Sequence, residues 1–302
     1  MNISSKQAML LMSLCAFMWS IGGLFIKILP WHPMVISGFR SLIAAAVIFI
    51  YMQFKGYRFT FSLHVLLAGL GLTGTMLFFV IASKLTTSAN AIILQSTNPV
   101  HIMIMSAVLF RVRYKKSELI AVAVTLAGIS LFFMDQLSPG NLLGNLIALL
   151  SGVTMGVMYL FSNRLPDEQS SMSSVLLGQG AAAVIGTSFA FFNPTPVNTA
   201  NILAILILGV AQLGVPYVLY AIAVRNCPPL SCSLIGMIEP LLNPVWVFFF
   251  VGEKPGFFAL VGGGIVLVTV TVWSIMSARS ALPQHHTGGN EAQRELQAGT
   301  DQ

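Results

Sequence analysis

The chain has 302 residues, of which 56% are hydrophobic and only 8% are charged, and its formal net charge is +6. A soluble domain carries about 25% charged residues, so this composition cannot cover a water-facing surface, and the surrounding medium has to be lipid. Lys and Arg gather in short clusters between apolar runs, which is typical of cytoplasmic loops in membrane proteins and gives no indication of a nucleic-acid partner.

Ten apolar stretches follow one another along the chain, and each approaches the roughly 20 residues that a membrane-spanning helix needs. Their length and lack of alternation exclude β-barrel strands. The predicted spans are residues 7–29, 34–54, 63–83, 89–110, 118–134, 142–161, 173–192, 202–224, 230–251 and 257–277. Residues 280–302 are polar and are predicted to form a disordered cytoplasmic tail.

The basic residues of the connections predict the orientation of these spans. With the N-terminus inside, the inside connections hold Lys55, Arg58, Arg111, Arg113, Lys115, Lys116, Arg164 and Arg225. The outside connections hold only Lys84 and Lys254, with Lys27 near the outer end of the first span. We therefore predict a multi-pass inner-membrane protein with both termini in the cytoplasm.

An internal repeat relates the two halves of the chain at an offset of 141 residues. The matching pairs are Ala82 and Lys84 with Ala223 and Arg225, and Asn98-Pro99 with Glu239-Pro240. Each half then holds five spans, and an odd number of spans makes the second half enter the membrane from the opposite side. The prediction is an all-α integral membrane fold of ten helices in two inverted five-helix repeats, residues 1–137 and 138–279, with a site near the midplane.

Six short segments occur in a fixed order from the first span to the last. They are Trp19-Ser20 followed by Lys27, Pro33 with Arg40, Ala82 and Lys84 followed by Ala89 and Ala91, Glu239-Pro240, Val251–Pro255, and Gly262–Gly264. Together they resemble the drug/metabolite transporter superfamily of the EamA type. The resemblance implies two inverted five-helix halves that transport small metabolites, often outward. Arg111 to Arg113 stand where this family usually has an acidic residue, and no tryptophan lies near Met155.

Glu239 is the most informative position, because it lies near the middle of the predicted ninth span. An ionisable group at that depth costs about 2.5–3.5 kcal/mol, so it normally faces a cavity or a partner. Pro240 and Pro244 lack backbone N–H groups and release the carbonyl groups of Gly236 and Pro240. This grouping suits a cation or a proton. A structural carboxylate paired with a basic residue is the alternative.

The fourth span carries a second polar segment within an apolar stretch. Pro99 releases the carbonyl group of Gln95, and Asn98 offers a polar side chain beside it. His101 follows Asn98 by one turn of the helix. Substrate binding or coupling is one interpretation of these side chains. For His101 the functional interpretation is a proton relay, and a hydrogen bond between helices is the alternative.

Two basic residues are candidates for binding an anion. Arg40 is the basic residue deepest within a span, and its planar fork suits a carboxylate or phosphate; a salt bridge to Glu239 or a side chain extended to the interface is the alternative. Lys27 lies near the outer interface, where extension towards water competes with substrate contact. Glu253 and Lys254 are predicted to form a local ion pair that holds the turn.

Aromatic side chains and glycines complete the candidate features. Rings that line a cavity stack on an aromatic or cationic solute, although packing or lipid contact is the alternative for each. The candidate rings are Trp19, Tyr159, Tyr217, Tyr220 and Trp246. The glycines of Gly152-x-x-x-Gly156, of Gly69, Gly71 and Gly74, and of Gly262–Gly264 are predicted to let helices approach closely. Pro216 after Gly214 predicts a break in the eighth span.

No zinc pattern, nucleophile elbow or phosphate loop occurs in the sequence. We therefore expect that the protein is not an enzyme, has no cofactor or metal site, and does not use ATP to drive transport. The preferred hypothesis is a secondary transporter that exports a small solute by alternating access, with proton exchange at Glu239. An organic-anion exchanger using Arg40 and Lys27 is the alternative, and a non-transporting membrane scaffold or receptor is a third. The predicted site residues are Glu239, Asn98, Arg40, Gln95, His101, Trp19 and Tyr220.

Overall fold

The computed structural model describes residues 5–111, 116–132, 139–162, 164–223, 238–254 and 256–281. Every regular element within these ranges is a helix. The first part holds α1 (Ser5–Ser20), α2 (Gly22–Ile28), α3 (Pro33–Lys55), α4 (Leu63–Leu85), α5 (Ser88–Gln95), α6 (Asn98–Phe110) and α7 (Lys116–Phe132). The second part holds α8 (Pro139–Ser162), α9 (Glu168–Ser188), η1 (Phe189–Phe191), α10 (Thr199–Leu206), η2 (Ile207–Gly214), α11 (Val215–Ala223), α13 (Ile238–Val251) and α14 (Phe257–Ala281).

Seven helical runs in the described ranges are long and apolar enough to cross a membrane. They are Gln7–Ile28, Pro33–Lys55, Leu63–Leu85, Ser88–Phe110, Leu142–Ser162, Glu168–Phe191 and Thr199–Tyr220. The helices α7 and α13 have 17 and 14 residues, and α14 has 25 residues, of which the apolar stretch Leu260–Thr269 is a part. An all-helical membrane protein is therefore confirmed, whereas the count of ten spans and the inverted repeat stay predictions.

Polar side chains set the starts of several helices by accepting a backbone N–H of the first turn. Ser62 Oγ accepts from Val65 N at 3.2 Å and starts α4. Asp167 Oδ1 accepts from Ser170 N at 2.7 Å and starts α9. The predicted seventh span began at residue 173, five residues too late, because the first turn of α9 is polar and lacks the apolar signal of a span.

Four of the predicted spans are not regular α-helices along their whole length, and the seventh predicted span ends in the 3-10 segment η1. The first is interrupted at Ile21, between α1 and α2, and the fourth at Ser96 and Thr97, between α5 and α6. The eighth passes through the π-helical segment η2, where Val215 N donates to Val210 O. The predicted break before Pro216 is thus a local widening of the helix, a common way to accommodate a proline.

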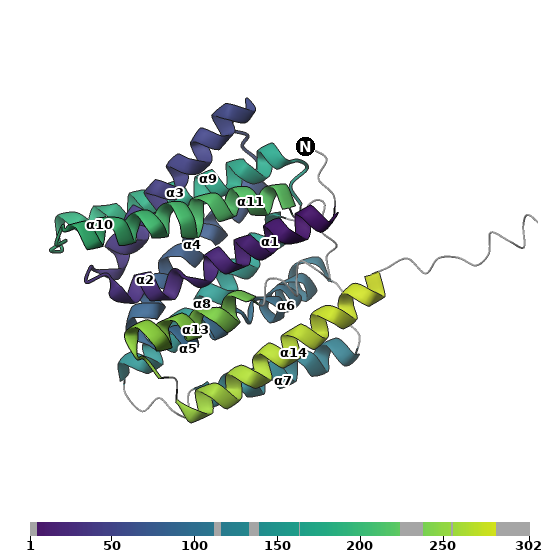
Figure 1. Ribbon diagram of the computed structural model, residues 1–302. Helices are drawn as coiled ribbons and strands as arrows, with labels where there is room; N and C mark the ends of the chain where they lie inside the picture. Colours follow the sequence, from purple (N-terminus) through teal and green to yellow (C-terminus); the bar gives the residue numbers. More distant parts are fainter. Residues whose placement is uncertain are drawn as a thin grey trace, which may run out of the picture.

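The two parts of the chain interleave in the bundle instead of packing as separate bodies. The helix α4 contacts both α8 and α9, and α3 contacts α9, while α7 and α14 form a pair at the margin (Figure 1). The predicted close approach is confirmed at Gly71 and Gly152: a Cβ atom on Gly71 would meet Met158 N at 2.5 Å, and one on Gly152 would meet Gln95 O at 3.1 Å. It is wrong at Gly264, where a Cβ atom would meet nothing within 4 Å.

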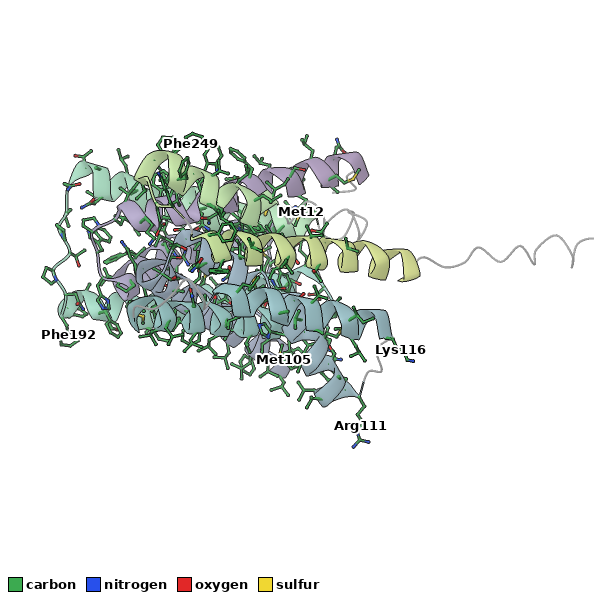
Figure 2. The ribbon with its side chains drawn as sticks, turned by 90° about the horizontal axis from the view of Figure 1, so that it is seen from below. Met12, Met105, Arg111, Lys116, Phe192 and Phe249 are labelled. Carbon is green, nitrogen blue, oxygen red and sulfur yellow. The ribbon has the colours of Figure 1, made fainter. Side chains whose placement is uncertain are left out.

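The two ends of the bundle differ in the residues that they present. Arg111 and Lys116 lie at one end and Phe192 at the other (Figure 2). The start of α1 and the end of α14 lie towards one side of the bundle, whereas α2 and the start of α10 lie towards the other (Figure 1). The orientation of these two ends relative to the membrane stays a prediction. Residues 224–237, which include the start of the predicted ninth span, and residues 282–302 of the predicted tail lie outside the described residues.

Candidate functional site

A cavity of ≈ 50 Å³ lies among helices from both parts of the chain. Its lining residues are Trp19, Arg40, Thr75, Met76, Phe79, Gln95, Met155, Met158, Tyr159, Gln212, Leu213, Tyr217, Tyr220 and Glu239. The helices α1, α3, α4, α5, α8, α11 and α13 and the segment η2 each contribute to this wall. Five of the seven predicted site residues line the cavity, and Asn98 and His101 do not.

Arg40 brings a buried cation to the wall of the cavity, since only 1% of this residue is exposed. Its Nη1 atom donates to Gln212 Oε1 at 3.4 Å, and Nη2 donates to Met76 O at 3.2 Å. The Nε atom has no hydrogen-bond partner. The predicted alternatives for Arg40, pairing with Glu239 or extension to the interface, are both wrong. A guanidinium with a free N–H beside a cavity can bind an anionic or carbonyl group of a solute.

Glu239 faces the same cavity from the first turn of α13 and is half-buried. Pro244 lies inside this helix, as the sequence predicts, whereas Gly236 lies outside the described residues. Glu239 and Arg40 share the cavity wall without forming an ion pair with each other. The wall therefore offers both a carboxyl group and a guanidinium. A solute can interact with either group, whereas a proton can bind only to the carboxylate.

Aromatic rings form one side of the cavity. The ring centroid of Trp19 lies 5.8 Å from that of Tyr217 and 5.9 Å from that of Tyr220. Gln212 holds this group in place, because its Nε2 atom donates to Trp19 O at 3.5 Å where α1 ends. Trp246 does not join them: its Nε1 atom donates to Ser20 Oγ at 3.0 Å, and Trp246 is not part of the lining.

The polar residues of the fourth span separate at the interruption between α5 and α6. Gln95 lines the cavity, and its Nε2 atom donates to Ser151 Oγ at 2.7 Å. The side chain of Asn98 donates to Gln95 O at 3.4 Å, which occupies the carbonyl group that Pro99 releases. His101 Nε2 and Thr97 Oγ1 are 3.1 Å apart. Asn98 and His101 thus contact the interruption and α8, where Asn98 Nδ2 lies 3.6 Å from Met155 Sδ, and neither lines the cavity.

Sequence reasoning missed half of the cavity wall. The lining residues that it did not propose for a cavity are Thr75, Met76, Phe79, Met155, Met158, Gln212 and Leu213. Thr75 and Gln212 are polar residues within apolar spans, and that signal alone could have identified them. Methionine, phenylalanine and leucine occur on every side of a membrane helix, so only the packing of neighbouring helices shows which of them face the cavity.

Lys27 lies outside the cavity and is held by other groups. Its Nζ atom forms an ion pair with Glu253 Oε1 at 2.9 Å and donates to Thr86 O at 2.8 Å. The prediction that Glu253 pairs locally with Lys254 is wrong. Because the end of α2 packs near the end of α13, the lysine of the first span reaches Glu253 and forms the pair.

Comparison with known proteins identifies relatives along nearly the whole chain. The sequence model of the EamA-like transporter family matches residues 6–134 and 142–275. An uncharacterized transporter of Archaeoglobus fulgidus is 25% identical over 276 residues, which cover 86% of this chain and 95% of the relative. A second uncharacterized transporter of the same organism is 26% identical over 202 residues, or 66% of this chain and 71% of the relative.

A solved crystal structure shares the fold of this chain. Its TM-score is 0.62 at 21% sequence identity, and the alignment covers 91% of this chain and 100% of the other. The two stretches matched by the family model divide the cavity wall between them. Trp19, Arg40 and Gln95 belong to the first stretch, and Tyr220 and Glu239 belong to the second.

Proposed function

We propose that this chain, which belongs to the EamA-like transporter family, exports a small metabolite or drug-like solute across the inner membrane by alternating access. One observation carries the proposal: polar, charged and aromatic side chains from both family-matched stretches line the same cavity. A site between two repeats is reached from one side and then from the other when one repeat moves against its partner.

The repeats of this proposal are residues 1–137 and 138–279, inverted relative to each other. Asn98-Pro99 and Glu239-Pro240 support the relation, because each dipeptide occupies the first turn of a helix, α6 and α13 respectively. The glycines at the contacts of α4 with α8 and α9 favour movement of one repeat past the other, since they bring helix backbones together with few interlocking side chains.

Solute binding requires the cavity to widen. A pocket for a small molecule usually has a volume of about 300–1,000 Å³, whereas this cavity has ≈ 50 Å³. The rings of Trp19 and Tyr220 and the flexible side chains of Met155 and Met158 are the groups that can rearrange around a solute. Binding energy from these contacts would then favour the conformations that hold the solute.

Glu239 is the proposed coupling residue. A carboxylate in a membrane-embedded cavity is costly to keep charged, so a proton or a cationic solute stabilises it. When a proton replaces the solute at Glu239, the return movement carries the proton inward, and export draws on the proton gradient. Arg40 and the aromatic rings would orient the solute while Glu239 exchanges its occupant.

The experiment begins with a ligand screen of the purified protein, because a solute that binds the native state raises its unfolding temperature. Flux of the identified solute is then measured in proteoliposomes with and without a pH gradient. We expect the gradient to drive wild-type flux, and Glu239→Gln to abolish that dependence. Glu168→Gln is the matched control: Glu168 lies outside the cavity and accepts from Tyr51 Oη at 3.2 Å, and glutamine keeps an acceptor there.

Two other outcomes distinguish the competing hypotheses. The presence of Arg40 in the cavity wall favours an organic-anion exchanger as the second candidate, which predicts counterflow of phosphorylated or carboxylated solutes without dependence on pH. Lys27 contributes little to this candidate, because Glu253 and Thr86 hold its ammonium group. A scaffold or receptor predicts no flux of any solute. Flux that ignores the gradient in both wild type and Glu239→Gln would refute proton coupling.

A further inference from the structure

The ion pair between Lys27 and Glu253 joins the two family-matched stretches at one end of the bundle. Glu253 Oε1 lies 2.9 Å from Lys27 Nζ, and Glu253 Oε2 accepts from Ser88 N at 3.2 Å. Lys27 also donates to Thr86 O. Both carboxylate oxygen atoms of Glu253, in the second family-matched stretch, thus accept from donors in the first stretch, Lys27 and Ser88. The side chains of Lys27 and Glu253 are only 16% and 20% exposed, so solvent screens the pair less than a surface salt bridge.

The backbone at the end of α13 places Glu253 in this position. Gly252 has φ +76°, a left-handed conformation that a residue with a side chain rarely adopts. The turn directs the following Glu253 back towards α2 and the start of α5. The connection between α13 and α14 therefore contributes Glu253 to the contact.

A packed apolar layer separates this ion pair from the cavity. Phe79 lines the cavity and also belongs to a buried cluster with Ile26, Leu29, Val80 and Ile92. These neighbours lie on α2, at the end of α2, on α4 and on α5, which are the segments that surround Lys27. At a rise of about 1.5 Å per residue, the pair lies about 10 Å beyond the cavity-lining positions of α4 and α5. The apolar layer and the ion pair together close this end of the cavity.

We propose that the Lys27–Glu253 pair is the gate of this end, and that the cavity opens here when the pair breaks. The proposal rests on the transport function given above, because alternating access requires one closed end that can open. On the predicted orientation this is the outer end. Movement of one repeat against the other separates Glu253 from Lys27 and Ser88, and the apolar layer then parts between α2, α4 and α5.

The test measures access to the cavity and does not require a known solute. A reporter, Met158→Cys, is placed in the cavity wall of a protein in which Cys15, Cys227 and Cys232 are replaced by alanine. A membrane-impermeant methanethiosulfonate reagent is applied to intact cells and, separately, to inside-out vesicles. Glu253→Gln weakens the gate in this background. The matched control is Lys254→Gln, which changes the exposed neighbouring residue and leaves the pair intact.

A second variant addresses the gate without changing a charge. Ser88→Pro removes the backbone N–H that binds Glu253 Oε2. Thr87, the N-cap of α5, has φ −71° and ψ 149°, which is the extended conformation that a following proline requires. Proline is tolerated at the first helical position, and Ser88 Oγ has no hydrogen-bond partner to lose. This variant carries the test if Glu253→Gln does not reach the membrane.

We expect Glu253→Gln to raise the labelling rate of the reporter from the outer face by about fivefold or more, which corresponds to about 1 kcal/mol in the closed-to-open ratio. Ser88→Pro gives a smaller increase, and Lys254→Gln gives none. Equal labelling rates in Glu253→Gln and Lys254→Gln on both faces would overturn the gate and leave the transport proposal intact. Increased labelling in a protein without flux would support the gate and count against transport.

Discussion

Replacing Gly186 with alanine tests the close contact of α9 with α3, on which the position of Arg40 depends. A Cβ atom on Gly186 would lie 2.5 Å from Gly38 Cα and from Met34 O. Both neighbours are backbone atoms, so no side chain can turn aside, and the two helices have to separate. Overpacking of this kind costs about 1–3 kcal/mol, and rigid neighbours favour the upper value. Alanine regains about 1 kcal/mol of helix propensity, which leaves a net loss of about 2 kcal/mol.

Gly180→Ala in the same helix is the matched control, because a Cβ atom there meets nothing within 4 Å. It should raise stability by about 0.5–1 kcal/mol. Thermal unfolding in one detergent compares the two variants, and at about 2–4 °C per kcal/mol they should differ by at least 5 °C. Gly186→Ala should also reduce ligand-induced stabilisation, since separation of α3 moves Arg40 away from Gln212. Equal unfolding temperatures for the two variants would refute the reasoning.

Two further predictions concern buried polar contacts. Asn145→Ala removes the oxygen that accepts from Thr86 Oγ1 at 2.8 Å and from Asn90 Nδ2 at 3.2 Å. Asn90 Nδ2 keeps its bond to Thr86 Oγ1 at 3.3 Å, whereas the buried Thr86 hydroxyl is left without this acceptor. A buried donor left unpaired costs about 1–3 kcal/mol, measured as a lower unfolding temperature. Arg40→Lys removes the planar guanidinium whose two terminal nitrogen atoms donate to Gln212 and to Met76 O. A single ammonium group on a shorter side chain cannot replace both donors. We expect the free energy of unfolding to fall by about 1–3 kcal/mol and the thermal shift with the solute to become smaller.

The controls for these two variants use the partly exposed Asn193 and the exposed Lys55. Asn193→Ala removes a hydrogen bond from Nδ2 to Phe189 O that is exposed to solvent, so its effect should stay within about 0.5 kcal/mol. Lys55→Arg replaces one basic side chain with another at an exposed site, and it should change neither stability nor ligand binding. An unfolding temperature of Asn145→Ala equal to that of Asn193→Ala would contradict the first prediction. An unchanged thermal shift for Arg40→Lys would contradict the second.

The sequence predicted the helical membrane fold because lipid imposes a simple requirement on composition. Apolar runs of about 20 residues can be counted, and residues 7–28, 33–55 and 63–85 were recognised as spans almost to their ends. The break between α5 and α6 was also predictable, since a proline removes a backbone donor wherever it stands. The start of α9 was missed because its first turn is polar, and the same polarity is found in loops.

The sequence also predicted part of the candidate site correctly and part of it wrongly. Glu239, Arg40, Gln95, Trp19 and Tyr220 were proposed because charge, amide groups and large rings are unusual in a span, and all five face one cavity. Whether they bind a solute stays a proposal. Asn98 and His101 were proposed on the same grounds, yet neither of them lines the cavity. Polarity shows that a side chain needs a partner within the protein, and it does not distinguish a cavity from a neighbouring helix.

The sequence by itself determined that the chain is helical, lies in lipid and belongs with transporters. Composition, span length and the order of motifs can all be read along the chain without knowing how it folds. Only the tertiary structure decided which partner each polar group has. Lys27 pairs with Glu253, 226 residues away, and not with a group in its own span. Lys254 is next to Glu253 in the sequence, but Glu253 forms its ion pair with Lys27. The ends of α2 and α13 meet because the two helices pack together. Separation along the chain does not show which residues are close in space.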